Sequence, residues 1–345
     1  MKIAHISWSM TNGGIENMLS DIINCQVSHC DVALVVINDA VDETILNRID
    51  KRCHVIRIGR KLKSRSPWFI IKLNYILWKG RYDILHVHND GFLKYIFYKG
   101  RRIATIHNSG FSSLKYSGCK VLACISKAVY DEMTKAGYKN CVRVDNGINV
   151  QSILRRRIDF YEGQLKIVQV SRLLLKQKGQ DILLKALSLL KHRGLENFTL
   201  DFIGSGVDEV ELKKMVVELN LEKHVRFLGN QSREYVYSHL KDYDLFVQPS
   251  RFEGFGLTVA EAMAACVPVL VSKNEGPLEI IDYGKYGYDF KNDNIHECSE
   301  KIAMFLFKKN DLTVIRKALQ HVSERYNIET MVRQYLMLYD KMLRQ

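Results

Sequence analysis

Residues 245–272, LFVQPSRFEGFGLTVAEAMAACVPVLVS, form one complete strand–loop–helix–strand unit of the chain. The apolar run Leu245–Gln248 predicts a buried strand that ends before Pro249, and a loop with two glycines follows. The segment from Leu257 predicts a helix, and the apolar run at residues 268–271 predicts the next strand. Strands joined through a helix run parallel in one sheet. The stretch therefore predicts an α/β fold.

The same alternation of strands and helices continues through both halves of the chain. Apolar runs in the first half predict strands at residues 2–7, 32–37, 55–58, 84–87, 103–106 and 121–124. Those in the second half predict strands at residues 166–170, 199–203, 225–228, 245–248 and 268–271. Such alternation is typical of doubly wound parallel sheets, which bind ligands outside the carboxyl ends of their strands. We therefore predict two Rossmann-like domains that face each other across a cleft.

The polar, arginine-rich stretch at residues 155–164 marks the expected boundary between these domains. A chain of 345 residues is about twice the usual size of one domain. We predict an N-terminal, acceptor-binding domain at residues 1–155, a C-terminal, donor-binding domain at residues 156–325 and a final helix at residues 326–345. The final helix has one apolar face and is expected to dock back on the first domain. That face is formed by Met331, Tyr335, Leu338 and Met342.

The composition is that of a soluble globular protein, with 47% hydrophobic and 26% charged residues. The first residues lack the pattern of a secretory signal, and no segment has the roughly 20 apolar residues of a membrane-spanning helix. We therefore expect a cytoplasmic protein. Its 8 cysteines include no C-x-x-C pair, so the sequence indicates neither a zinc site nor a disulfide framework.

The net charge of +13 predicts a partner that carries negative charge. Residues 51–82 contain no acidic residue, and from Arg57 to Arg81 basic residues lie among aromatic and apolar ones such as Trp68 and Trp78. Two interpretations remain open: contact with an anionic membrane surface, or a buried helix followed by a solvated basic loop. Nucleic acid is not expected as a partner, because the aromatic residues fit no RNA-binding motif.

Two glutamates, Glu253 and Glu261, lie on either side of the helix start at Leu257. The free N–H groups and positive dipole end of a helix N-terminus bind phosphate. Glu261, about one turn into the helix, can accept hydrogen bonds from the vicinal hydroxyls of a ribose, and Glu253 can do so for a sugar ring. The spacing alone is also compatible with an exposed helix face. The position between a strand end and a helix start favours a nucleotide-sugar site.

The segment closely resembles the signature of the family 4 retaining glycosyltransferases, E-x7-E within S-x-x-E-G-F-G-L-x-x-x-E-A-M-A. The resemblance extends over nearly the whole chain. It implies the GT-B architecture, in which two Rossmann-like domains face each other, and a hexosyltransferase activity of class EC 2.4. It also implies that the donor contacts the two glutamates and the residues between them, Gly254, Phe255, Gly256, Leu257 and Thr258.

The segment GGIE at residues 13–16 resembles the G-G-x-E loop of the family. In the family, backbone amides of this loop approach the diphosphate of the donor or the acceptor. Glycine permits that approach because it has no Cβ. We therefore assign Gly13 and Gly14 to donor binding, although two adjacent glycines alone would indicate only a turn.

Two histidine-containing strands also match the family. The segment DILHVHN at residues 83–89 resembles its D-x-x-H-x-H strand, and ATIHN at residues 104–108 resembles its T-x-H motif. The resemblance implies that His107 lies against the donor sugar. We assign acceptor binding to His88 and Asn108.

The segment RLLLKQKG at residues 172–179 resembles the R-L-x-x-x-K-G phosphate clamp of the family. A leaving nucleoside diphosphate gains negative charge as the glycosidic bond breaks, so Arg172 and Lys178 would stabilise the transition state while they bind the donor. The spacing is one residue longer than the common form, which leaves Lys176 as an alternative, but the glycine that follows favours Lys178. The predicted catalytic residues are Glu253, His107, Arg172 and Lys178.

Three further turns resemble parts of the family's nucleotide pocket. The glycines at residues 204–206 follow a strand, and so do Gly229 and Asn230, which the resemblance places near the base. Ordinary turn chemistry is an equal alternative for both. The segment at residues 274–279 resembles the family's G-x-x-E segment, with Glu275 in place of the first glycine.

Other patterns are interpreted as structural. Asp242-Tyr243-Asp244 matches the D-x-D that other glycosyltransferases use to hold a metal, but it precedes a buried strand, so neither a metal nor another cofactor is expected. His86 and His88 could ligate zinc, but no third ligand is evident, which makes them buried or pocket-lining residues. The glycine loop lacks the G-x-G-x-x-G spacing of NAD-binding proteins.

The sequence thus predicts a retaining glycosyltransferase that moves a hexose or N-acetylhexosamine from a nucleotide sugar to a glycan acceptor. Family frequency favours a UDP sugar. The basic, aromatic stretch favours a lipid-linked acceptor in the synthesis of a cell-surface polysaccharide such as lipopolysaccharide or capsule, with the protein peripheral on the inner membrane face. Two alternatives remain: a sugar-nucleotide epimerase of the same fold, and a basic nucleic-acid-binding protein.

Overall fold

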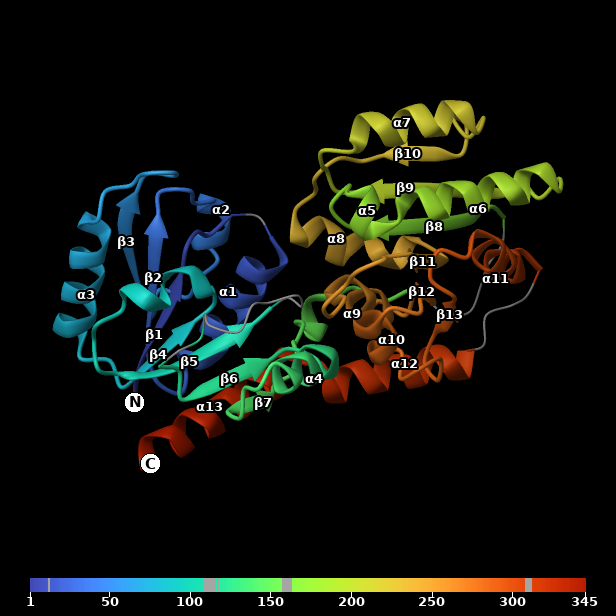
Figure 1. Cartoon of the computed structure of the whole chain (residues 1–345). Coiled ribbons are helices and arrows are strands. Elements are labelled where there is room, and N and C mark those ends of the chain that lie inside the picture. The colour runs from blue at the N-terminus through green and yellow to red at the C-terminus, as the bar shows by residue number, and fades with distance from the viewer. Residues whose placement is uncertain (12, 108–115, 117, 157–162, 308–311) are drawn as a thin grey trace. The chain divides into compact units, whose positions relative to one another are not determined.

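The computed structural model describes residues 1–11, 13–107, 116, 118–156, 163–307 and 312–345. These residues form two compact units (Figure 1). One unit comprises Met1–Gly147 together with Ile328–Gln345, and the other comprises Ile148–Asn327. The chain therefore passes between units after residues 147 and 327, where the sequence analysis placed the boundaries after residues 155 and 325.

The described part of the first unit is built on a 7-stranded parallel sheet with the strand order β3-β2-β1-β4-β5-β6-β7. Its strands are β1 (Lys2–Ser7), β2 (Asp31–Asn38), β3 (His54–Arg60), β4 (Ile84–Val87), β5 (Arg101–Ile106), β6 (Val121–Cys124) and β7 (Cys141–Arg143). Its helices are α1 (Gly14–Gln26), α2 (Glu43–Leu46), α3 (Trp68–Gly80), α4 (Lys127–Lys135) and α13 (Ile328–Arg344), with a 3-10 turn η1 (Asp90–Tyr95).

The described part of the second unit has a 6-stranded parallel sheet with the order β10-β9-β8-β11-β12-β13. Its strands are β8 (Leu165–Val170), β9 (Phe198–Ile203), β10 (Val225–Phe227), β11 (Leu245–Gln248), β12 (Val269–Ser272) and β13 (Tyr288–Phe290). Its helices are α5 (Leu175–Lys178), α6 (Gln180–His192), α7 (Glu209–Glu218), α8 (Arg233–His239), α9 (Leu257–Ala264), α10 (Glu275–Ile280), α11 (Ile295–Phe307) and α12 (Leu312–Arg325), with short 3-10 turns η2 (Val150–Ser152) and η3 (Leu240–Asp242).

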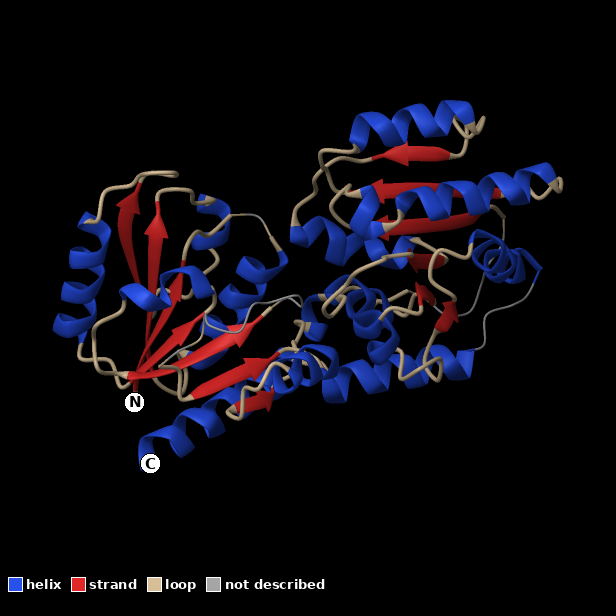
Figure 2. Ribbon diagram, in the orientation of Figure 1, coloured by secondary structure: helices blue, strands red, loops and turns tan. Residues whose placement is uncertain are grey.

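Both sheets are covered by helices, which explains why their central strands are apolar without alternation (Figure 2). Every residue of β4, β11 and β12 is buried. The three-residue edge strands β7 and β13 were not predicted, whereas β10, an edge strand of the same length, was.

The last helix, α13, packs against the sheet of the first unit. Met331, Tyr335, Tyr339 and Met342 are buried in one cluster with residues of β1, β4 and β5. The predicted apolar face is therefore the packed face, although Leu338 is only partly buried and Tyr339, which was not predicted, lies at its centre. Among the described residues, no helix is both long and apolar enough to cross a bilayer.

Candidate active site

Lys178 and Glu253 form an ion pair within the second unit. Lys178 Nζ contacts Glu253 Oε2, and Gln248 Nε2 donates a hydrogen bond of 3.3 Å to the same oxygen. Lys178 ends α5, and Glu253 lies in the loop between β11 and α9, beyond the carboxyl end of the strand. Lys178 is buried while the alternative Lys176 is exposed, so the lysine that reaches this loop is Lys178.

Gly179 explains why the lysine lies beside this loop. Its φ of +65° falls in the left-handed region, and a Cβ built there would lie 2.0 Å from the carbonyl oxygen of Pro249. Only glycine lets the turn between α5 and α6 approach Pro249 so closely. Gly179 therefore acts through packing. The close approach that it permits places Lys178 within reach of Glu253.

Arg251 fixes the position of the same loop by hydrogen bonds, a role that was not predicted from the sequence. Its guanidinium donates two hydrogen bonds to Asp181 of α6, of 2.8 and 3.0 Å, and one of 2.8 Å to the carbonyl of Leu175. Hydrogen bonding to Asp181 raises the pKa of Arg251. Burial raises the pKa of Asp181, but the bonds from Arg251 prevail and lower it, so both groups stay charged. A residue inside the R-F-E-G segment thus stabilises the loop that carries Glu253.

The start of α9 has the geometry of a phosphate-binding helix N-terminus. Gly256 precedes the helix with a φ of +100° and no side chain caps it. The first amides of a helix have no partner within it, so those of Leu257 and Thr258 are open to an anion. Phe255 is buried and packs edge-on against Tyr326 at 5.5 Å, so its side chain belongs to the core.

Glu261 is a buried carboxylate of α9. Its Oε1 accepts a hydrogen bond of 3.3 Å from the hydroxyl of Tyr237 on α8. The guanidinium of Arg233 lies over the Tyr237 ring, 4.7 Å from its centroid, and contacts the same hydroxyl. Because Glu261 is only 9% exposed, the interpretation of an exposed helix face is wrong. Neither Tyr237 nor Arg233 was identified from the sequence, since nothing in the local pattern of α8 points to α9.

Arg172 lies exposed in the loop after β8, and its backbone is fixed by Gln180. Gln180 Nε2 donates to the carbonyl of Arg172 over 2.9 Å. A Cβ at Gly204 would lie 2.0 Å from the carbonyl oxygen of Ser171. The glycine turn after β9 therefore lets two strand-end loops pack together, which is a structural reason for this glycine.

Two other predicted turns lie at strand or helix ends of the second unit. Gly229 has a φ of +67° and accepts a hydrogen bond of 2.8 Å from the amide of Gly204, while Asn230 is exposed. A Cβ at Gly276 would lie 2.6 Å from the carbonyl oxygen of Glu253, so the start of α10 rests on the Glu253 loop. The side chain of Glu275 lies outside the described part of the structure.

The first unit places Gly13 and Gly14 at the start of α1, just beyond the end of β1. Gly13 has an extended backbone with a φ of −143°, which any residue can adopt. The nearest described atom to a Cβ built there would be a carboxylate oxygen of Glu16, at 2.4 Å. The assignment of these glycines to donor binding stays a prediction. The predicted acceptor residue Asn108 lies outside the described residues.

Four histidines lie close together at β1, β4 and the end of β5. His5 Nδ1 and His88 Nε2 are 2.9 Å apart, and the rings of His88 and His107 stack at 5.8 Å. His107 follows β5, and neither of its ring nitrogens has a partner among the described residues. Burial lowers the pKa of His107 to about 4, so the ring is neutral and can donate a hydrogen bond from one nitrogen and accept one at the other.

The sequence analysis was wrong that His86 and His88 lack a third candidate ligand, because β1 pairs with β4 and places His5 opposite His86. The three rings offer nitrogens within 4.8 Å of one another. However, His5 also bonds Gln26 (2.7 Å), and His86 bonds the hydroxyls of Tyr339 (2.6 Å) and Thr105 (2.7 Å). Because those ring nitrogens already have hydrogen-bond partners, His5, His86 and His88 belong to a buried hydrogen-bond network. His88, assigned to acceptor binding, is only 2% exposed.

Asp244 has the predicted structural role. Its carboxylate pairs with Arg156 and accepts a hydrogen bond of 2.8 Å from the amide of Lys166, which ties β11 to β8. The D-x-D segment therefore stabilises the sheet of the second unit.

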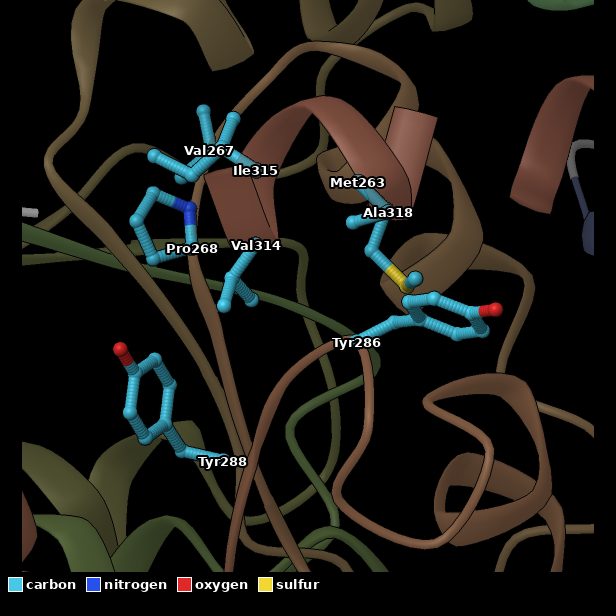
Figure 3. Close-up of a pocket in the computed structure, with 8 residues that line it drawn as sticks. All are labelled: Met263, Val267, Pro268, Tyr286, Tyr288, Val314, Ile315 and Ala318. Atoms are coloured by element: carbon cyan, nitrogen blue, oxygen red, sulfur yellow. The ribbon is translucent and has the colours of Figure 1, made fainter. Parts of the chain in front are cut away.

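A small apolar pocket in the second unit lies away from these groups (Figure 3). Val267 and Pro268 in its wall lead into β12, so it opens at the amino ends of the strands, opposite the Glu253 loop. No charged side chain lines it. Its remaining lining residues are Met263, Tyr286, Tyr288, Val314, Ile315 and Ala318.

Models of two glycosyltransferase families match the chain. The model described as "Glycosyl transferases group 1" matches residues 150–322, and the model described as "Glycosyltransferase Family 4" matches residues 12–152. An uncharacterized glycosyltransferase of Methanocaldococcus jannaschii is 25% identical over 221 residues, which cover 64% of this chain and 59% of that protein. The O-antigen biosynthesis glycosyltransferase WclY of Escherichia coli is 23% identical over 100% of this chain and 99% of its own.

A solved structure with the same fold is HepE of Anabaena in complex with UDP and glucose. It is 19% identical, with a TM-score of 0.83 over 99% of both chains. The chain spans 59% of the M. jannaschii relative and half of a Staphylococcus aureus poly(ribitol-phosphate) α-N-acetylglucosaminyltransferase. The group 1 model covers half of the chain, and the matched residues include Lys178, Glu253 and Glu261. The chain therefore belongs to the glycosyl transferases group 1 family, with the GT-B fold.

Proposed function

We propose that the chain is a retaining hexosyltransferase that moves a hexose or N-acetylhexosamine from a UDP sugar to a glycan. The observation that carries the proposal is the arrangement beyond β11, where buried Glu261, the start of α9 and the Lys178–Glu253 pair come together. Two carboxylates beside a helix N-terminus suit a ligand with two sets of hydroxyls and a diphosphate between them. Family membership supports the reaction class.

Each of these groups has a distinct role in the proposed reaction. Glu261 accepts hydrogen bonds from the ribose, and the amides at the start of α9 bind the diphosphate. Arg172 and Lys178 stabilise the charge that the diphosphate gains as it leaves. The leaving diphosphate helps to deprotonate the acceptor on the same face of the sugar, which retains the configuration. No side chain serves as nucleophile, and no metal is required.

The Lys178–Glu253 ion pair suggests how the two charged groups are stabilised before a ligand binds. A buried lysine and a partly buried carboxylate such as Glu253 each cost free energy unless they are paired. When the donor binds, its phosphate offers Lys178 a second anion, and Glu253 becomes available to the hydroxyls of the sugar. His107, whose ring nitrogens have no partner in the described part, is the proposed contact of the first unit with that sugar.

We further propose a lipid-linked glycan acceptor at the cytoplasmic face of a membrane. Relatives named as glycosyltransferases of O-antigen biosynthesis and, putatively, of colanic acid biosynthesis support an acceptor from cell-surface polysaccharide synthesis. A sugar-nucleotide epimerase would bind the same donor but would release a changed sugar nucleotide when no acceptor is present.

The test is a thermal shift with UDP-, GDP- and ADP-sugars, followed by analysis of products with and without lipid-linked glycan, each with and without EDTA. We expect UDP sugars to raise the melting temperature, EDTA to have no effect, and UDP release to require acceptor. Stabilisation by no sugar nucleotide would contradict the proposal, and an altered sugar nucleotide formed without acceptor would indicate an epimerase.

A further inference from the structure

Helix α3 exposes four large apolar side chains along one stripe. Trp68, Ile71, Tyr75 and Trp78 are 66%, 59%, 56% and 69% exposed. They stand at positions i, i+3, i+7 and i+10, which lie on one side of an α-helix. The rings of Tyr75 and Trp78 are neighbours, with centroids 6.4 Å apart. Large apolar side chains that are exposed side by side are typical of a surface that binds a partner.

The opposite face of α3 already packs within the first unit. Phe69, Leu73 and Leu77 are buried, and α3 lies along β3 at the outer edge of this unit. Among the described residues of the unit, no other helix covers the outer side of α3 (Figure 1). The interpretation of a buried helix therefore holds for one face of α3 only, and contact with a membrane stays a prediction. The helix is a packed element of the domain, and it also presents an unpartnered apolar face.

Phe97 extends this surface beyond the helix. Its side chain is 69% exposed, and its amide donates a hydrogen bond of 2.6 Å to the side-chain oxygen of Asn74 on α3. Asn74 also donates to the carbonyls of Ile70 (2.9 Å) and Tyr95 (2.8 Å), which fixes the segment after η1 against the helix. The apolar surface thus spans two elements that the partly buried side-chain amide of Asn74 holds together.

Basic side chains surround the apolar stripe. Lys61, Lys63 and Arg65 are exposed in the loop that leads into α3, and Lys79 is exposed on the helix itself. Lys72 is also exposed, but its ammonium group donates a hydrogen bond of 2.8 Å to the carbonyl of Ile58 on β3. None of these five makes an ion pair with a described residue, whereas Arg57 is already paired with Glu43. Since residues 51–82 contain no acidic residue, nothing on this segment offsets their charge.

We propose that α3 is a membrane-docking surface, which inserts Trp68, Ile71, Tyr75, Trp78 and Phe97 into the headgroup region of an anionic bilayer. Tryptophan and tyrosine favour the membrane–water interface, and lysines around them attract anionic lipids. A second copy of this chain is a poorer partner, because a symmetric contact would bring two identical basic rims together. The inference rests on the proposed function in that a lipid-linked acceptor would be presented at that surface.

The test compares the wild-type chain with two double variants in vesicle sedimentation. W68Q/W78Q removes the aromatic ends of the stripe, and V210Q/V217Q is the matched control on α7 of the second unit, where both valines are similarly exposed. We expect wild type to sediment with vesicles that contain phosphatidylglycerol and not with pure phosphatidylcholine. W68Q/W78Q should lose at least about tenfold in binding, while V210Q/V217Q should bind like wild type.

A third variant, K61Q/K63Q/R65Q, tests the electrostatic part. It should weaken binding to anionic vesicles by about fivefold for each charge removed, and salt should weaken wild-type binding in the same way. In wild type, vesicles should also shift tryptophan emission to the blue. Equal binding to neutral and anionic vesicles, or no loss in W68Q/W78Q, would overturn the proposal, and so would a dimer of wild type that W68Q/W78Q converts to a monomer.

Donor binding separates this inference from the proposed function. The thermal shift by a UDP sugar and the melting temperature without ligand should be equal in wild type and W68Q/W78Q. A wild type that binds the donor but no vesicle overturns the docking surface and leaves the glycosyltransferase assignment intact. A wild type that binds vesicles but no sugar nucleotide overturns the proposed function and leaves the docking surface.

Discussion

Glu261 is a charged residue of the candidate site that lies buried in the second unit. A carboxylate that is 9% exposed loses most of its hydration, and this cost is tolerable only if hydrogen bonds replace the water. Tyr237 supplies one such bond, and Arg233 beside it supplies positive charge close by. Glu261 therefore keeps its buried carboxylate in a hydrogen-bonded environment, and its role in binding ribose hydroxyls stays a prediction.

Replacing Glu261 by alanine should weaken donor binding about 10- to 100-fold, because hydrogen bonds to a charged group contribute about 1.5–3 kcal/mol. The protein should remain folded, with an unchanged circular dichroism spectrum. The matched control is E211A on α7, an exposed glutamate, which should bind the donor like wild type. Calorimetric titration with the donor measures both, and wild-type affinity with normal turnover in E261A would refute the role.

At the scale of elements, glycines decide how closely the strand-end loops of the second unit approach. Gly179, Gly204 and Gly276 each lie where a Cβ would come within 2.6 Å of a backbone oxygen of another loop. The sequence identified these glycines as parts of motifs or turns. Their packing partners could not be predicted, because Pro249, Ser171 and Glu253 are distant along the chain and meet them only once the sheet has formed.

Replacing Gly179 by alanine should destabilise the second unit far more than the same change at Gly194. Both residues have positive φ, +65° and +75°, so both variants incur the cost of about 1–2 kcal/mol for a left-handed alanine. Gly194 has nothing within 4 Å of the added Cβ, whereas at Gly179 it would meet the carbonyl of Pro249. We expect a further loss of about 1–3 kcal/mol in the free energy of unfolding, measured with urea. Equal losses in the free energy of unfolding for the Gly179 and Gly194 variants would show that the Pro249 loop moves to make room for the Cβ.

At the scale of the whole chain, α13 returns from the second unit to complete the first. Tyr335 and Tyr339 of this helix bond Thr105, His86 and Gln26, so the C-terminal residues satisfy polar groups on strands from the N-terminal half. Burial lowers the pKa of His5 to about 4, and it lowers those of His86 and His88 well below the ordinary value. The core of the first unit therefore requires neutral histidines.

The stability of the first unit should fall as the pH drops from about 6.5 to 4. The unfolded chain takes up protons near pH 6.5, while buried His5 and His107 resist protonation down to about pH 4. Their stabilising contribution is thus complete above pH 6.5 and is lost through this window, by about 3 kcal/mol for each histidine. Urea unfolding at several pH values measures it through the fluorescence of Trp8, Trp68 and Trp78, which all lie in the first unit.

The variant H5Q should show a shallower dependence of stability on pH over this range. H29Q, which changes an exposed histidine, should retain the wild-type dependence. A free energy of unfolding that is the same at pH 7.5 and pH 5 in wild type would contradict the prediction.

The sequence by itself determined the parallel sheets, because apolar strands that alternate with helices are buried when helices cover both faces of a parallel sheet. It also identified the segment at residues 249–261, since strand end, glycine loop and helix start are adjacent in the chain. Only the tertiary structure decided that Glu261 is buried beneath Tyr237, that Lys178 reaches Glu253, and that His5 joins His86 and His88. These contacts join residues 24 to 83 positions apart. Such pairs leave no local periodicity, because strand order and loop packing bring them together.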